Sequence, residues 1–390
     1  MAEKPLRVAL VAGEASGDLL GAALMQAFRT LRPDVKFVGV AGPGMIAAGC
    51  EALASSDELA VMGFVEPIRH LPRLYLLRRR LIREFLRDPP DVFVGIDSPA
   101  FNLGLARRLK RAGLPTVQYV SPQVWAWRQG RVRTMGEAVD LVLCLLPFEA
   151  DFYARHAVKA LFVGHPLADQ IPLDIDRAAA RQALGLPGDA RVVALLPGSR
   201  LGEVTRLGAD FAAASRLLAA RAGTGLPPLF IAPMANERVR AVFASQVTAA
   251  GATVRLLDGQ SRLALEAADA VLVASGTATL ETMLCKRPMV VAYRVAPLTA
   301  FVARDMGLVK VRFCSHPNLL ADEALVPEFL QEAVTPAALA AALALQLDDA
   351  DNRERLTARF RTIHASLRQG GARQAASAVL ELLRERAAAR

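Results

Sequence analysis

Short runs of aliphatic and β-branched residues recur along this 390-residue chain, separated by longer stretches with helical periodicity. Runs without polar alternation are typical of strands that are buried on both faces of a parallel sheet. Strands that alternate with helices form right-handed βαβ crossovers and doubly wound sheets. The sequence therefore predicts an α/β fold. The runs form two series, 7–12, 36–42, 91–97, 116–121, 141–147 and 161–166, then 191–199, 228–233, 253–257, 270–275 and 288–293.

The two series predict two domains, because a chain of this length is long for one hydrophobic core. We expect two Rossmann-like domains that face a cleft, the first over residues 1–170 and the second over 191–365. Residues 171–190 are predicted to be a linker with one short helix. Residues 366–390 carry apolar positions at helical spacing and predict a C-terminal helix, which could pack back on the first domain.

Composition narrows the class of protein. With 53% hydrophobic and 22% charged residues, the chain has the composition of a globular protein and not of a disordered one. No uncharged apolar run approaches the roughly 20 residues of a membrane-spanning helix, and no cleavage pattern of a signal peptide precedes the first run. The net charge of +9 suggests an acidic partner, which could be nucleic acid, anionic lipid or a phosphorylated substrate.

Ligands of open α/β sheets bind beyond the carboxyl ends of the strands, and one such loop in the second half has the residues of an anion site. In LLPGSRLGEV, Gly198, Ser199 and Arg200 lie between a predicted strand and a predicted helix. Backbone N–H groups at a helix start, together with a guanidinium group, can bind phosphate oxygens. The alternative is an ordinary turn with a surface arginine.

A second loop of this kind is LVASGTATLE. Ser275, Gly276 and Thr277 are predicted to cap a helix whose first N–H groups attract phosphate, and Glu281 follows one helical turn later. A carboxylate at that place can accept hydrogen bonds from ribose hydroxyls. The alternative is a capped helix with a solvated glutamate. Together, the two loops predict a site for a nucleoside diphosphate.

In the first half, acidic side chains follow two predicted strands. Asp97 in GIDSPAFN is a candidate general base, and Glu14 in VAGEASGD lies where a pyrophosphate would be repelled and sugar hydroxyls would be accepted. In YVSPQVWAWRQGRVR, both tryptophans of the chain, Trp125 and Trp127, lie next to arginines. They could stack on a sugar or pack under a loop. In SHPNLLAD, His316 and Asn318 could simply be packing and capping residues.

Taken in order, VAGEASGD, FVGVAGP, DVFVGID, YVSPQVWAWR, LPGSR, LVASGT with TLE, and PNLLA resemble the lipid-A-disaccharide synthase family over nearly the whole chain. The resemblance implies a GT-B fold and an inverting glycosyltransferase of lipid A biosynthesis. The implied donor is UDP-2,3-diacylglucosamine and the implied acceptor is 2,3-diacylglucosamine 1-phosphate. The implied products are a β-1,6-linked disaccharide phosphate and UDP.

The resemblance also implies roles for individual residues. It assigns sugar and acceptor chemistry to Glu14, Ser16 and Asp97. Ala100 stands where the family usually has an aspartate, which strengthens Asp97 as the acting carboxylate, and His316 stands where an apolar residue is expected. The residues assigned to the donor nucleotide are Gly198, Ser199, Arg200, Ser275, Gly276, Thr277, Glu281 and Asn318.

No D-x-D-like pair of metal ligands occurs in a suitable loop, so we expect no metal and no other cofactor. The resemblance implies a cytoplasmic enzyme that is peripheral on the inner face of the inner membrane, with no nucleic-acid partner, and it leaves a homo-oligomer open. Two alternatives remain. One is another UDP-sugar enzyme of the GT-B fold, either a transferase or a 2-epimerase. The other is a non-catalytic module that binds membrane or nucleotide.

Residues 61–88 are the candidate membrane contact. Leu74, Leu77, Leu81 and Phe85 recur at helical spacing, so the segment predicts an amphipathic helix with its apolar face among acyl chains. Arginines for anionic head groups crowd the same stretch, at Arg73, Arg78, Arg79, Arg80, Arg83 and Arg87. The alternative is a core helix whose arginines form a solvated face.

Overall fold

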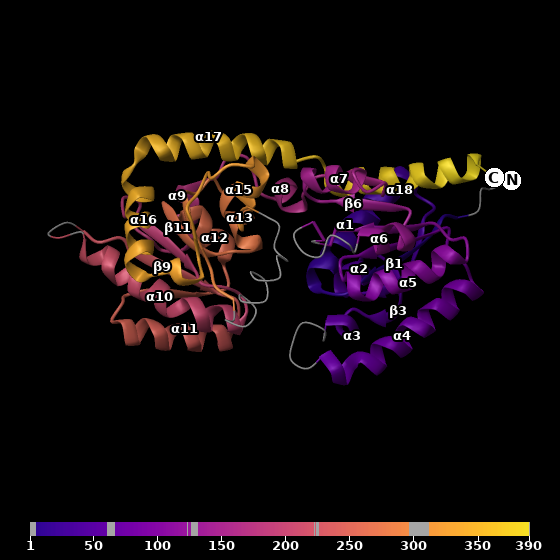
Figure 1. Cartoon of the computed structure of the whole chain (residues 1–390), viewed down its shortest axis with the longest axis horizontal. Coiled ribbons are helices and arrows are strands. Elements are labelled where there is room, and N and C mark those ends of the chain that lie inside the picture. Colours follow the sequence, from indigo (N-terminus) through magenta and orange to yellow (C-terminus); the bar gives the residue numbers. More distant parts are fainter. Residues whose placement is uncertain are drawn as a thin grey trace. The chain divides into compact units, whose positions relative to one another are not determined.

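The computed structural model describes residues 5–60, 67–122, 124–125, 132–221, 223, 226–295 and 312–389. It divides the chain into two compact units (Figure 1). Unit 1 comprises Met1–Asp169 with Leu367–Arg390, and unit 2 comprises Gln170–Ser366. Trp127 and residues 61–66 of the candidate membrane segment lie outside the described residues.

Each unit is built on a parallel sheet, which confirms the predicted α/β class. Among the described residues, the sheet of unit 1 has seven strands in the order β3-β2-β1-β4-β5-β6-β7. Val8 of β1 pairs with Phe37 of β2 on one side and with Val92 of β4 on the other, so the order reverses between β1 and β4. The carboxyl ends of these two strands are where ligands of such sheets bind. The strands are β1 (Arg7–Ala12), β2 (Lys36–Ala41), β3 (Cys50–Ser55), β4 (Val92–Ile96), β5 (Thr116–Tyr119), β6 (Leu141–Cys144) and β7 (Ala160–Phe162).

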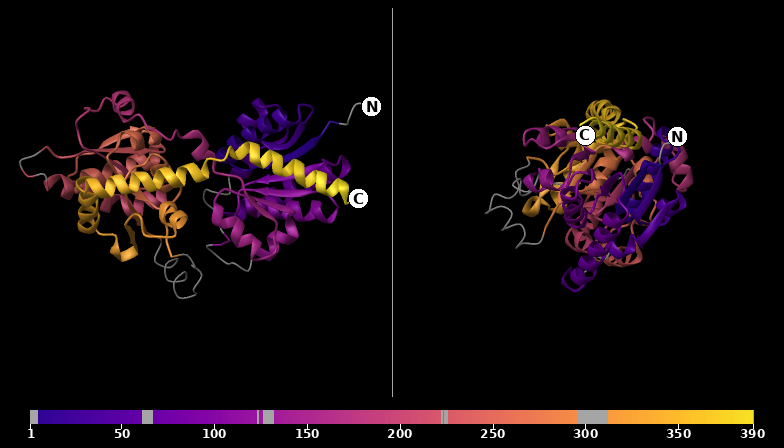
Figure 2. Two further views of the ribbon diagram at one scale, coloured as in Figure 1. Left: turned by 90° about the horizontal axis from the view of Figure 1, so that it is seen from above. Right: turned by 90° about the vertical axis from the view of Figure 1, so that its right-hand side faces the viewer.

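Helices cover both faces of this sheet. Alternate residues of β1 point to opposite faces, so Ala9 and Val11 lie in one apolar cluster and Val8 and Leu10 in the other. The C-terminal helix α18 belongs to the second cluster and packs along α1 (Figure 2). The helices are α1 (Ala15–Leu31), α2 (Pro43–Ala47), α3 (Asp57–Ala60), α4 (Pro67–Arg87), α5 (Pro99–Arg111), α6 (Val132–Ala138), α7 (Pro147–Ala154), α8 (Pro166–Gln170) and α18 (Gly371–Ala388).

The sheet of unit 2 has the same kind of topology. Within the described ranges, six parallel strands follow the order β10-β9-β8-β11-β12-β13. Val193 of β8 pairs with Ala270 of β11 and with Phe230 of β9, so the order reverses between β8 and β11. The strands are β8 (Val192–Leu196), β9 (Leu229–Met234), β10 (Arg255–Asp258), β11 (Ala270–Ala274), β12 (Met289–Tyr293) and β13 (Glu328–Leu330).

The residues that the sequence predicted to be a linker contain helix α9, which belongs to unit 2. One face of the sheet is covered by α10, α11 and α16, whose apolar residues share a cluster with β8 and β11. The helices are α9 (Arg177–Ala183), α10 (Leu201–Ala220), α11 (Glu237–Ala250), α12 (Ser261–Ala267), α13 (Thr277–Leu284), α15 (His316–Ala321), the short 3₁₀ helix η3 (Gln331–Ala333), α16 (Pro336–Asp348) and α17 (Ala350–Leu367).

The structure of helix α4 contradicts the prediction that its apolar face lies among acyl chains. Leu74, Leu77, Leu81 and Phe85 do not face acyl chains, because all four are buried in the core of unit 1. Burying four large apolar side chains against the sheet stabilises the unit by several kcal/mol. The helical spacing was predicted correctly, but the surface against which it packs is protein.

Candidate functional site

A pocket of about 330 Å³ lies at the carboxyl ends of β8, β9 and β11 in unit 2. This volume is at the lower end of the range for small-molecule sites, roughly 300–1,000 Å³. The structure brings the predicted donor residues to this pocket, with the exception of Asn318. The lining residues are Leu196, Gly198, Ser199, Arg200, Glu203, Pro233, Met234, Ala235, Gly259, Ser261, Ala274, Ser275, Gly276, Thr277, Ala278 and Glu281.

The first wall of the pocket is the turn between β8 and α10. Gly198 has φ +135°, and a Cβ there would lie 2.4 Å from the Cβ of Glu203, so the turn requires glycine. Glu203 Oε2 accepts hydrogen bonds from the backbone N–H groups of Ser199 at 3.0 Å and Arg200 at 3.2 Å. Its other oxygen accepts from the Arg200 guanidinium at 3.0 Å. The donors of the predicted anion site therefore already hold a carboxylate.

The second wall is the turn between β11 and α13. The Ser275 hydroxyl donates to the carbonyl of Cys314 at 2.7 Å, whereas Gly276 and Thr277 are exposed at the start of α13. His316 holds the same turn from the other side: its Nδ1 lies 3.0 Å from Thr279 Oγ1, and its backbone N–H donates to that oxygen at 3.1 Å. Burial lowers the pKa of His316, so the ring is neutral at pH 7.

Glu281 lies one turn along α13 and also lines the pocket. The side chain is half-buried. Burial raises the pKa of its carboxyl group, and the nearby positive charge of Arg262 opposes this shift. A partly desolvated carboxylate is a strong hydrogen-bond acceptor, which suits the vicinal hydroxyls of a ribose.

Asn318 has a different place from the other donor residues. It is buried, and its amide nitrogen donates to the carbonyl of Val326 and to Glu328 Oε1, each at 2.9 Å. Its amide oxygen accepts from the N–H of Val326 at 2.9 Å. Glu328 also binds the N–H groups of Cys314 and Ser315. Asn318 therefore helps to fix the segment whose Cys314 carbonyl binds Ser275.

In unit 1, Asp97 follows β4 directly, at the switch point of the sheet. It has φ +50°, and Ser98 has φ +41°, which is unusual for residues other than glycine. The turn is held through its main chain: the Asp97 carbonyl accepts from Asn102 Nδ2 at 2.9 Å and from Gln118 Nε2 at 3.0 Å. No hydrogen bond of the Asp97 carboxylate occurs among the described residues. The side chain is half-buried.

The turn after β1 lies against this strained turn. A Cβ at Gly13 would lie 2.2 Å from the Ser98 hydroxyl oxygen, so only glycine allows the two turns to approach this closely. Glu14 and Ser16 follow Gly13 and are exposed. The structure thus brings all three candidate acceptor-side residues to adjacent turns of one sheet.

Asp18, the second acidic residue of the stretch VAGEASGD after β1, has a structural role. It is buried, and its carboxylate accepts from the N–H groups of Gly42 at 2.9 Å, Gly44 at 2.7 Å and Met45 at 3.0 Å. These are the first N–H groups of α2, which have no partner within the helix.

Sequence reasoning missed four residues that organise these turns: Glu203, Thr279, His316 as a partner of Thr279, and Glu328. Glu203 could have been found, because a glutamate three residues after the residue that precedes a helix is the spacing of a capping box. The contacts of Thr279, His316 and Glu328 join segments far apart in the sequence, so no local signal reveals them.

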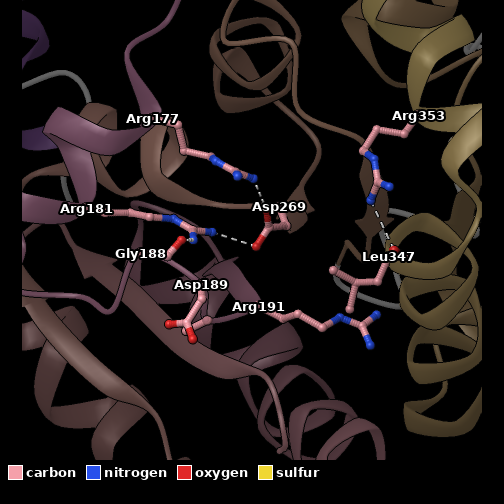
Figure 3. A pocket seen from close by; sticks show the side chains of 9 residues that line it. Arg177, Arg181, Gly188, Asp189, Arg191, Asp269, Leu347 and Arg353 are labelled. Carbon is pink, nitrogen blue, oxygen red and sulfur yellow. Dashed lines mark hydrogen bonds and ion pairs between the residues drawn. The ribbon is translucent and has the colours of Figure 1, made fainter.

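A second hollow of about 170 Å³ lies near the amino ends of β8 and β11 (Figure 3). It is rich in arginine, but these side chains bind protein acceptors. Arg181 donates to Asp269 Oδ2 at 2.7 Å and to the carbonyl of Gly188 at 2.6 Å, and Arg177 pairs with the other oxygen of Asp269. Arg353 donates to the carbonyl of Leu347 at 3.1 Å. The contacts of Arg177 and Arg181 with Asp269 attach α9 to the amino ends of the strands. The candidate site lies at the carboxyl ends of the same strands.

Among the described residues, no helix is long and apolar enough to cross a membrane. In the same ranges, no group of three or more His, Cys, Asp or Glu side chains could hold a metal ion.

Comparison with known proteins adds a second line of evidence. Residues 8–382 match the family model described as lipid-A-disaccharide synthetase. The chain is 56% identical to lipid-A-disaccharide synthase of Azotobacter vinelandii, over 97% of this chain and 98% of that one. It is 53% identical to the enzyme of that name from Pseudomonas aeruginosa, over 98% of this chain and 99% of the other.

Solved structures confirm the fold. The calicheamicin glycosyltransferase CalG4 matches 99% of this chain and 100% of its own, with TM-score 0.60 and 18% identity. The UDP-GlcNAc 2-epimerase from Neisseria meningitidis bound to UDP-GlcNAc covers 97% of this chain and 100% of its own, with TM-score 0.64 and 12% identity. The chain is therefore similar in architecture to glycosyltransferases of the GT-B type.

Proposed function

This chain belongs to the lipid-A-disaccharide synthase family, and we propose that it transfers 2,3-diacylglucosamine from UDP-2,3-diacylglucosamine to 2,3-diacylglucosamine 1-phosphate. It is a glycosyltransferase of lipid A biosynthesis. The observation that carries the choice of a UDP-linked donor is the pocket of unit 2, which gathers the two anion-binding turns and Glu281 around one space.

On the donor side, the pocket offers positive charge to the diphosphate. The phosphate oxygens replace Glu203 at the N–H groups of Ser199 and Arg200, because both ligands are anions that need the same donors. The exposed start of α13 at Thr277 adds the positive end of a helix dipole. Glu281 binds the ribose hydroxyls.

On the acceptor side, Asp97 accepts the proton of the acceptor 6-hydroxyl group. The oxygen of that hydroxyl forms a bond to the anomeric carbon while the bond from this carbon to the phosphate oxygen breaks. The configuration inverts in this single displacement, and the electron pair leaves with UDP. Glu14 is the second candidate for the base, and Ser16 lies in the same turn.

Stabilising the departing UDP needs fixed positive charge, and Arg200 with the start of α13 supplies it in this proposal. We therefore expect the transfer to proceed without a metal ion, so that a chelator in the assay leaves the rate unchanged.

The direct test is to mix purified protein with diacylated donor and acceptor and to follow UDP and the disaccharide phosphate by mass spectrometry. Both products are expected in equal amounts. Conversion of the donor without acceptor would instead favour an epimerase, and the absence of any conversion would favour a binding module.

Binding of UDP alone tests the donor pocket. Arg200→Ala should weaken UDP binding about 10–100-fold, which corresponds to the roughly 1.5–3 kcal/mol of a hydrogen bond to a charged group. Glu281→Gln should weaken it less, through the ribose. Isothermal titration calorimetry measures both dissociation constants. Arg191→Ala is a matched control, because this arginine of unit 2 lines the other hollow. Equal affinity in wild type, Arg200→Ala and Glu281→Gln would remove the assignment.

For substrates with acyl chains we propose that the protein binds an anionic membrane surface on the cytoplasmic side of the inner membrane. The outward face of α4 supports this. Tyr75 is 57% exposed and Leu76 is 63% exposed, and Arg79, Arg80 and Arg83 lie beside them on the exposed side of the helix. Apolar side chains flanked by arginines suit the interface between acyl chains and anionic head groups.

Arg78 is not part of this face. Its guanidinium donates to the carbonyl of Ala100 at 3.1 Å and stacks over the ring of Phe101 at 5.1 Å. Burial lowers its pKa, as expected for a cation held against protein. Arg78 therefore fastens α4 to the turn after Asp97, and a membrane test should leave it intact.

Replacing Arg79, Arg80 and Arg83 by glutamate should release the protein from anionic vesicles, because each arginine contributes roughly 1 kcal/mol near such a surface. Co-sedimentation with vesicles measures the bound fraction, and added salt should lower it gradually. The control changes Arg108, Arg111 and Arg373 to glutamate, which alters the net charge equally on exposed sites of α5 and α18. Binding that survives the first triple change would remove α4 as the contact.

A further inference from the structure

Unit 1 contains a buried carboxyl group that is not one of the candidate catalytic residues. Glu149, in the first turn of α7, is only 4% exposed. Its Oε1 accepts a hydrogen bond from the indole N–H of Trp125 at 3.0 Å, and its Oε2 accepts from the backbone N–H of Leu146 at 3.0 Å. Glu149 thus joins α7 to the segment that follows β5.

The ring of Trp125 packs against other side chains of unit 1 and does not lie open for stacking on a sugar. Its ring packs edge-on against Phe148, with the centroids 4.8 Å apart, and it belongs partly to the core. Of the two readings of this tryptophan, packing under its loop is the one that the structure supports. Its N–H group donates to Glu149, so the position of the Trp125 ring depends on this carboxyl group.

The same segment contacts Asp97 at its other end. The amide nitrogen of Gln118 donates to the Asp97 carbonyl at 3.0 Å and to the Val120 carbonyl at 3.2 Å. Val120 has φ +75°, a conformation that a β-branched residue adopts only when its surroundings impose it. Next to it, the Ser121 hydroxyl lies 3.1 Å from the hydroxyl of Tyr153 on α7. A set of contacts therefore leads from Tyr153 on α7 through Ser121, Val120 and Gln118 to Asp97.

The charge on Glu149 is costly to the fold. Burial raises the pKa of this carboxyl group from 4.5 to about 7, although the hydrogen bonds from Leu146, Trp125 and Ser121 act in the opposite direction. Because the pKa is higher in the folded state, the contribution of Glu149 to stability is full below pH 4.5 and is lost as the pH rises through 7. If residue 149 contributed only to the stability of the fold, a neutral side chain at this position would serve equally well.

We propose that Glu149 is a positioning residue of the transfer reaction, which in its ionised form holds Trp125 and residues 120–122 in the place that the acceptor requires beside Asp97. This inference rests on the proposed function. An ionised carboxylate accepts both N–H groups at once and binds each more strongly than a neutral acid does. The segment is therefore held more firmly above pH 7 than below it.

Two further ionisable groups among the described residues interact with Glu149, and neither titrates in this range. Cys144 on β6 and Tyr153 on α7 both interact with its charge, and burial raises the pKa of each far above neutral pH. Both side chains stay uncharged between pH 6 and 8.5. A change near pH 7 in this cluster therefore reports Glu149.

The first test uses fluorescence and needs no turnover. The chain has two tryptophans, so W127F leaves Trp125 as the single emitter. We expect its emission to change between pH 6 and 8.5 with a midpoint near 7, and we expect this change to vanish in W127F/E149Q. Asp151→Asn, which removes an exposed charge from the same helix, is the matched control and should keep the titration. A flat emission in W127F, or a titration that persists without Glu149, overturns the proposal.

The second test uses kinetics at pH 8. E149Q and W125F should each lower kcat/KM for the acceptor about tenfold or more, the usual effect of losing a hydrogen bond to a charged group. Their effects should not add in the double variant, because both remove the same contact. The inflection near pH 7 in the wild-type profile should be absent from E149Q, and the dissociation constant for UDP should stay within twofold.

The outcomes separate the two hypotheses. Additive effects of E149Q and W125F, or wild-type kcat/KM in both, overturn the positioning role. A wild-type protein that converts no donor overturns the proposed function, whereas the emission test still decides whether Glu149 holds Trp125. If a thermal melt followed by circular dichroism shows that E149Q is misfolded, W125F, which keeps an aromatic ring at this position, decides the kinetic test.

Discussion

Asp97→Asn should lower kcat about 10²–10⁴-fold, the usual effect of removing a general base. The change is mild for the fold. Asparagine tolerates a positive φ, and the turn is held by the Asp97 main chain, whose carbonyl binds Asn102 and Gln118. We therefore expect the melting temperature and the affinity for UDP to stay near wild type. The measurement is the initial rate of UDP release at saturating donor and acceptor.

Glu14→Gln is the comparison for this prediction, since Glu14 is the second carboxylate of the adjacent turns. If Asp97→Asn stays within a few-fold of wild type while Glu14→Gln is inactive, the roles of the two residues are exchanged. Asp34→Asn, on the exposed turn before β2, serves as the control for a general loss of negative charge in unit 1.

Asp269→Asn should destabilise unit 2 by about 3–5 kcal/mol, the usual cost of removing one partner of a buried ion pair. Asp269 Oδ2 accepts from Arg181, which is only 3% exposed, and from the N–H of Val192 at 2.8 Å. Asparagine turns one acceptor into a donor and leaves the Arg181 charge unpaired. Urea unfolding followed by circular dichroism measures the difference in free energy.

Asp348→Asn is the control for the stability measurement. Asp348 pairs with Arg191, and both side chains are largely exposed, so the loss should be about 0–1 kcal/mol. Equal stability of wild type and Asp269→Asn would show that the arginines of this hollow are held by their carbonyl partners alone.

Most of the central strands could be predicted from the sequence because they are buried on both faces and consist mainly of apolar residues. Among the edge strands that the structure describes, β7 and β10 were predicted by the runs 161–166 and 253–257, whereas β3 and β13 were not. β3 reads CEALAS and exposes Glu51 and Ala52, while β13 comprises only Glu328, Phe329 and Leu330. A strand with one neighbour meets weaker demands on its composition, so its local signal is weak.

Seven of the eight residues that the sequence assigned to the donor line one pocket, because the carboxyl-end rule selects loops by topology alone. Partners within those loops were harder to find. Asn318 was assigned to the nucleotide, yet its side chain binds Val326 and Glu328. Helical spacing in α4 was likewise ambiguous, because a core and a lipid surface select the same apolar positions.

Helix α18 has a consequence for how the protein is made. Its residues Ala375, Ala376, Val379 and Leu382 complete the apolar cluster on the α1 face of the first sheet. During synthesis, at roughly 5–20 residues per second, all of unit 2 leaves the ribosome before these side chains do. The later unit can thus close its core first, while the earlier one carries an open apolar face for about 10–40 seconds.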